Sequence, residues 1–88
     1  KLRFDYTLEG SAGREPFLVG AIYHDDLFTY IHCAAREKPA LYEVKDGKPN
    51  LIQFQFENNV YIAPKIIDNG YLAVGKKKLV FTRHVSGQ

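Results

Sequence analysis

Apolar and polar residues alternate along most of this chain, which is the pattern expected of half-buried β-strands. The first segment shows it clearly, because Phe4, Tyr6 and Leu8 are separated by charged or polar residues. Helical spacing is nearly absent, and only residues 34–38 could form a short helical turn. The further segments that we interpret as strands are 17–24, 27–33, 40–45, 52–56, 60–63, 71–74 and 79–83.

Residues that favour tight turns separate these segments. Asp25 and Asp26 tolerate left-handed backbone conformations, so we predict that they form the turn of a hairpin. Asp46-Gly47 is a strong hairpin signal of the same kind. The remaining predicted turns are Glu57-Asn58-Asn59, Asp68-Asn69-Gly70 and Gly75-Lys76.

Two prolines affect the strands near them. Beyond Pro49 the alternation predicts one strand with Ile52, Phe54 and Phe56 on its inner face. Pro64 should end the strand 60–63 or mark it as an edge strand, because proline cannot donate to a ladder.

Seven or eight short strands spaced near ten residues apart predict an all-β fold, a small antiparallel β-sandwich or a small barrel. The 88 residues suffice for one domain, 1–88, with a single core. The polar residues 84–88 are predicted to be frayed. Because the chain has no methionine, we expect it to come from a longer precursor.

Charge and hydropathy exclude some classes of function. The chain has 12 basic and 10 acidic residues mixed along its length, for a net charge of +2. It lacks the basic stripe that nucleic-acid backbones require, and it lacks an apolar run near the roughly 20 residues of a membrane helix. We interpret the one basic run, Lys76 to Lys78, as a solvated turn that discourages edge-to-edge pairing.

His24, Asp25, Asp26 and His32 are the residues most suggestive of a metal or acid–base site. A tight turn at Asp25-Asp26 would place the two histidines about five residue pairs apart, or roughly 16 Å at about 3.3 Å per residue. One metal ion could not bridge that distance, so we predict no metal site.

Other catalytic arrangements are also unsupported. Cys33 is the only cysteine, which excludes an internal disulfide and a paired-thiol metal site. His32 precedes it, but neighbouring side chains of a strand point to opposite faces. Ser11 and Ser86 lie in a loop and in the tail, so a hydrolase triad has no rigid nucleophile. We therefore predict no catalytic residue and no cofactor, and a buried free thiol at Cys33.

The aromatic residues leave two interpretations open. Phe28, Tyr30, Phe54 and Phe56 could stack on bases, which makes a barrel that binds single-stranded nucleic acid the alternative function. Aromatic residues at alternating positions are more often part of a core. Tyrosines combine an apolar body with a polar tip and are enriched at protein interfaces. The chain has six of them: Tyr6, Tyr23, Tyr30, Tyr42, Tyr61 and Tyr71.

Three stretches in order resemble one family: IYHDDLFTYI at 22–31, KPALYEV at 38–44 and DGK at 46–48. They are similar to the C-terminal domain of the TrbG-like conjugal transfer proteins, the ninth VirB component of type IV secretion systems. The resemblance covers residues 17–81. Asp26 stands where the family usually has a glycine, and Leu27 where it usually has an arginine.

The resemblance implies a β-sandwich in the periplasm that forms the C-terminal domain of a structural, non-enzymatic subunit. Such subunits belong to the outer-membrane core complex through which conjugative DNA or effector proteins pass. The implied partners are a small outer-membrane lipoprotein, the channel-forming subunit and further copies of the subunit in a ring. Contact with the membrane would be through these partners only, and no direct binding of nucleic acid is expected.

We place the candidate partner contacts at Phe4, Tyr6, Leu8, Leu27 and Tyr30. The first strand is the candidate free edge, where an extended segment of the lipoprotein could add as a further strand. Some members of the family are linked to the lipoprotein by a disulfide, for which Cys33 would be the candidate intermolecular thiol here.

Overall fold

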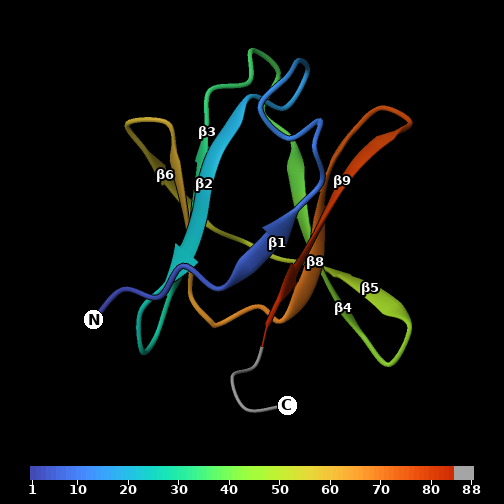
Figure 1. Cartoon of the computed structure of the whole chain (residues 1–88). Helices are drawn as coiled ribbons and strands as arrows, with labels where there is room; N and C mark the ends of the chain where they lie inside the picture. Colours follow the sequence, from blue (N-terminus) through green and yellow to red (C-terminus); the bar gives the residue numbers. More distant parts are fainter. Residues whose placement is uncertain (85–88) are drawn as a thin grey trace.

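Nine strands form two antiparallel sheets in the computed structural model, which describes residues 1–84 (Figure 1). This arrangement confirms the predicted β-sandwich and is not a closed barrel. None of the described residues forms a helix, so they include no helix that could cross a membrane. The five-stranded sheet has the order β1 (Tyr6–Leu8), β9 (Lys77–Arg83), β8 (Asn69–Val74), β4 (Ala40–Lys45) and β5 (Lys48–Leu51). The four-stranded sheet has the order β2 (Val19–His24), β3 (Thr29–Cys33), β7 (Val60–Ala63) and β6 (Gln55–Glu57).

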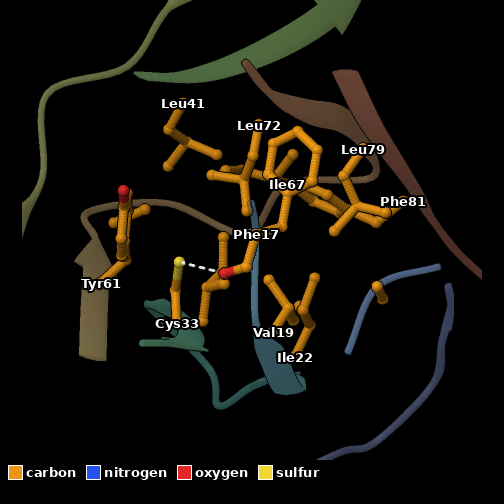
Figure 2. Close-up of a cluster of buried hydrophobic side chains, with 13 residues drawn as sticks. Phe17, Val19, Ile22, Cys33, Leu41, Tyr61, Ile67, Leu72, Leu79 and Phe81 are labelled. Carbon is orange, nitrogen blue, oxygen red and sulfur yellow. Dashed lines mark hydrogen bonds between the residues drawn. The ribbon is translucent and has the colours of Figure 1, made fainter. Parts of the chain in front are cut away.

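The core lies between the facing sheets, where every second residue of the central strands points inward (Figure 2). Tyr61 is the largest side chain there, and its hydroxyl donates a 2.6 Å hydrogen bond to the Pro39 carbonyl oxygen. Burial raises the pKa of that hydroxyl. The side chains with no exposed surface include Ile31, Leu41, Ile67, Leu72, Leu79 and Phe81.

Two predicted turns have the backbone that the residue types suggested. Asp46 and Gly47 have φ values of 53° and 74°, and they join β4 to β5. Asn58 and Asn59 have φ values of 51° and 64°, and they join β6 to β7. Two successive residues with positive φ match the right-handed twist of the strands that they connect. β7 ends at Ala63, directly before Pro64, as predicted.

The turn predicted at Asp68-Asn69-Gly70 is wrong, because Asn69 and Gly70 are the first residues of β8. Glycine is required at position 70 by close packing. A Cβ atom there would lie 2.5 Å from the Tyr42 carbonyl oxygen and 2.9 Å from the Phe81 ring.

The strand predicted beyond Pro49 is divided between the two sheets. β5 ends at Leu51, and the chain crosses over before β6 begins. Ile52 and Phe54 pack against the core within this crossing segment. Phe56 pairs with the buried Tyr61 and so lies on the inner face, as predicted, but it stays 37% exposed because β6 is the edge strand of the smaller sheet.

The helical turn that residues 34–38 could have formed is absent. The Ala34 N–H donates to the Leu18 carbonyl oxygen at 3.0 Å, outside the segment. Pro39 disfavours the helical conformation of the residue before it. Of the predicted frayed tail 84–88, residues 85–88 lie outside the described residues, and the His84 N–H donates to the Asp5 carbonyl oxygen at 2.7 Å.

Candidate functional site

The N-terminal segment crosses from one sheet to the other (Figure 1). Arg3 forms an isolated bridge with His24 at the end of β2, and three residues later the chain enters β1 beside β9. Phe4 lies in the crossing and is 66% exposed. The predicted free edge is confirmed in position, since β1 is an outer strand of the five-stranded sheet.

Four aromatic rings form a continuous strip, which we call the aromatic surface: Phe4, Tyr23, Phe28 and Tyr30. The ring centroids are 4.7 Å apart for Phe4 and Tyr23, 5.2 Å for Tyr23 and Tyr30, and 6.4 Å for Phe28 and Tyr30. Tyr23 and Tyr30 alternate with buried residues of β2 and β3, so they stand on the outer face of the four-stranded sheet. The rings are therefore available to a partner.

Asp25 organises the loop next to the aromatic surface. Its carboxylate accepts hydrogen bonds from the Tyr30 hydroxyl at 2.7 Å and from the backbone N–H groups of Leu27 and Phe28 at 2.8 and 2.7 Å. These bonds, that of Tyr30 first, lower the pKa of Asp25 to about 2. The loop leaves Leu27 67% exposed beside the aromatic surface.

This loop also changes the predicted hairpin register. His24 pairs with Thr29, not with Leu27, and the Asp25 N–H donates to the Phe28 carbonyl oxygen at 3.1 Å, so the turn lies at Asp26-Leu27, one residue later than predicted. His32 therefore pairs with Ala21, three positions from His24, or roughly 10 Å at about 3.3 Å per residue. The prediction of about 16 Å is wrong.

The two histidines nevertheless face different surroundings. The buried His24 ring lies 3.1 Å from Asp5 Oδ1, on the inner side of the sheet. His32 lies on the outer face, where its Nε2 is 2.7 Å from the Tyr23 hydroxyl. Within residues 1–84 there is no group of three or more side chains that could hold a metal ion.

A shallow hollow of about 370 Å³ continues the aromatic surface at Phe28. Ile62 of β7 and Gln55 of β6 contribute to it, and they are paired residues on one face of the sheet. The complete lining is Phe28, Gln53, Phe54, Gln55, Ile62 and Pro64. An apolar side chain of a partner could enter here beside the exposed rings.

Cys33 is buried in the core, as predicted (Figure 2). Its Sγ donates a 3.0 Å hydrogen bond to the Phe17 carbonyl oxygen. Burial raises the pKa of the thiol, which disfavours the reactive thiolate. A disulfide to a partner would require this part of the core to open.

The features that suggested a nucleic-acid site lie on different sheets. Phe28 and Tyr30 stand on the outer side of the four-stranded sheet, whereas Lys76 to Lys78 are at the β8–β9 turn of the other sheet. Phe54 and Phe56 pack on Tyr61 instead, with ring centroids 4.1 and 5.4 Å from its ring. The rings and the lysine run thus do not line a common groove.

The structure divides the predicted partner contacts into two groups. Phe4, Leu27 and Tyr30 lie on or beside the aromatic surface. Tyr6 and Leu8 instead turn their side chains toward the core, so only their backbone is available at the edge. The predicted partner contacts did not include Tyr23 or Phe28, although Tyr23 was among the interface-type tyrosines and the alternation around the buried Ile22 puts it on the outer face.

Fold and surface together define a small β-sandwich domain with an exposed aromatic strip suited to contacts with other proteins. The chain belongs to the CagX family of conjugal transfer proteins, whose model matches residues 1–84. No curated protein matches the chain. The family comprises components of secretion systems and is not a known family of enzymes. The finer, TrbG-like assignment stays a prediction.

Proposed function

We propose that this domain is a structural subunit of the outer-membrane core complex of a type IV secretion or conjugation system. The observation that carries the proposal is the match to a conjugal transfer family over residues 1–84. In this role the domain works in the periplasm and is attached to the outer membrane through its partners. It binds a small lipoprotein and the channel-forming subunit, and copies of it form a ring.

The free edge of β1 supports binding of an extended lipoprotein segment. Thr7 is paired with Thr82 of β9. Val80 lies two residues before Thr82 in β9, and its N–H donates to the Glu9 side chain. This hydrogen bond shows that the Val80 N–H points to the side of β9 on which β1 lies. Thr7 and Thr82 are therefore the hydrogen-bonded pair, and the backbone groups of Tyr6 and Leu8 point away from β9. An added strand would find donors and acceptors there.

The aromatic surface supplies side-chain recognition next to that edge. Phe4 lies two residues before β1 and its ring contacts that of Tyr23, so a segment running along β1 would reach the exposed Phe4 ring. Buried aromatic anchors contribute much of the binding energy of protein interfaces. We propose that Phe4, Leu27 and Tyr30 contact the lipoprotein or the channel-forming subunit.

Purification of the parent protein from the cell envelope tests the assembly role. We expect the lipoprotein and the channel-forming subunit to co-purify with it. Deletion of residues 1–9 should abolish lipoprotein binding, but it also removes the Tyr6 and Leu8 side chains from the core. Phe4→Ala is the milder variant, and we expect it to weaken lipoprotein binding about tenfold.

Leu51→Ala is the matched control, because Leu51 is 64% exposed but belongs to β5, at the opposite edge of the five-stranded sheet from β1. It should leave lipoprotein binding unchanged. Full-strength binding by the chain lacking residues 1–9 would refute the assignment to the β1 edge. An envelope preparation that contains neither partner would refute the assembly role.

A further inference from the structure

A second free edge lies beside β1, because β9 is much longer than its neighbour. β9 has seven residues, and β1 pairs only with Phe81, Thr82 and Arg83 (Figure 1). No strand of the described chain pairs with the outer side of Lys77–Val80. We call this segment the β9 edge.

The β9 edge has backbone N–H and C=O groups that point outward and could pair with a further strand. The Val80 N–H points outward and donates a 3.1 Å hydrogen bond to Glu9 Oε1. Alternate residues of a strand direct their backbone groups to the same side, so the N–H and C=O of Lys78 also point to the free edge. The Glu9 carboxylate thus occupies the place of a carbonyl group in a ladder.

Space for a short extended segment is present on both sides of Val80. A hollow of about 460 Å³ is lined by Thr7, Leu8, Glu9, Val80 and Thr82. A second hollow of about 300 Å³, by the start of β9, is lined by Ser11, Glu15, Pro16, Phe17, Lys77 and Lys78.

The charges around the β9 edge favour an acidic segment. Lys76, Lys77 and Lys78 take part in none of the ion pairs among residues 1–84. Lys78 Nζ lies 4.6 Å from the centre of the Tyr71 ring of β8, which holds its charge on the outer face of the sheet, next to β9. The acidic groups nearby are Glu15, which lines the smaller hollow, and the Glu9 carboxylate on the Val80 N–H.

We propose that the β9 edge binds an extended acidic peptide of a partner as an added strand, which displaces Glu9 from the Val80 N–H. Carboxylates at alternate positions of the peptide lie on the same face as Lys78, and the intervening residues face Pro16 and Phe17. Displacement of Glu9 also moves its negative charge away from the acidic peptide, which reduces repulsion. The proposal concerns β9, so it is independent of the role proposed for β1 and Phe4.

The test is an NMR titration of the isotope-labelled chain with two short capped peptides, one alternating threonine with glutamate and the other threonine with lysine. Val80→Pro removes the outward N–H at a position where an edge strand tolerates proline. Val80→Ala is its matched control, since it shortens the half-exposed side chain and keeps the N–H. Glu9→Ala removes the competing carboxylate without touching the backbone of β9.

We expect the glutamate peptide to shift the amide signals of Lys78 and Val80 and to bind at least about tenfold more tightly than the lysine peptide. Val80→Pro should lose this binding, Val80→Ala should keep it, and Glu9→Ala should strengthen it several-fold. If Val80→Pro does not fold, Glu9→Ala decides. Unshifted amides, equal binding of both peptides, or unchanged binding by Glu9→Ala would overturn the proposal.

Discussion

Thr29 is the polar residue that holds the connection between β7 and β8 in place. Its side chain is fully buried, and its hydroxyl donates to the Lys65 carbonyl oxygen at 2.8 Å and accepts from the Ile67 N–H at 3.0 Å. The Ile67 carbonyl oxygen in turn accepts a hydrogen bond from the Tyr6 hydroxyl, so the same connection holds β1. Thr29→Val keeps the shape of the side chain and removes both of its hydrogen bonds.

The expected loss follows from the two backbone groups left behind. An unpaired buried donor or acceptor costs about 1–3 kcal/mol, so we expect Thr29→Val to lower the free energy of unfolding by about 2–4 kcal/mol. For a chain of this length 1 kcal/mol corresponds to about 4–8 °C in Tm, so Tm should fall by about 10–30 °C. Urea and thermal unfolding followed by circular dichroism would measure both quantities.

Thr29→Ser separates the hydroxyl from the methyl group. The serine keeps both hydrogen bonds and loses one buried methyl, which costs about 1 kcal/mol. We therefore expect the serine variant to be more stable than the valine variant. The reverse order, or a valine variant within about 0.5 kcal/mol of the wild type, would refute the reasoning.

Three further predictions concern other parts of the molecule. Gly70→Ala should lower the free energy of unfolding by about 2 kcal/mol or more, because its Cβ would lie 2.5 Å from a carbonyl oxygen, whereas Gly20→Ala meets no atom within 4 Å and should leave the urea midpoint nearly unchanged. An NMR titration of the Asp25 carboxyl group should give a pKa near 2. Tyr30→Phe should raise this pKa, because it removes the strongest hydrogen bond to the carboxylate. This pKa lies below the value of about 3.9 in unfolded chains, so the carboxylate stabilises the fold above about pH 4 and its contribution is lost as the pH falls toward 2; acid unfolding of Asp25→Asn should lack that part of the pH dependence. The Cys33 thiol, whose pKa burial raises, should react with a thiol reagent only after unfolding in urea, and rapid labelling of the native protein would contradict its burial.

Much of the fold could be predicted because it depends on neighbouring residues. β4 and β7 have the predicted bounds, Ala40–Lys45 and Val60–Ala63. The Asp46-Gly47 turn beside β4 and the Asn58-Asn59 turn beside β7 use residue types that adopt positive φ at little cost. Alternation then determines which side chains of these strands enter the core.

The errors arose where a distant contact or one side chain changed the local pattern. Gly70 belongs to a strand because it pairs with Glu43 of β4 and Phe81 of β9, and only glycine fits there because a Cβ atom would collide with the Tyr42 carbonyl oxygen and the Phe81 ring. The hairpin between β2 and β3 turns one residue later than predicted, where the Asp25 carboxylate binds two N–H groups of its own loop. Neither contact follows from residue type alone.

The candidate surface was predicted only in part. Phe4, Leu27 and Tyr30 were expected to contact partners, and the structure brings them together with Tyr23 and Phe28. That they bind a partner remains a prediction. The contact of Phe4 with Tyr23 depends on the Arg3 bridge to His24, which brings Phe4 to β2 from outside the sheet, and no local pattern indicates such a crossing.

The sequence by itself determined the all-β class, most of the turns and the membership of a conjugal transfer family, since alternation, turn residues and ordered motifs are properties of short stretches. Only the tertiary structure decided which strands are edges and which aromatic rings meet. Those properties depend on pairings between residues far apart in the chain, such as Thr7 with Thr82 and Arg3 with His24. β1 is a free edge because it is the outer strand of its sheet, and β9 has a second free edge because its seven residues lie beside a strand of only three.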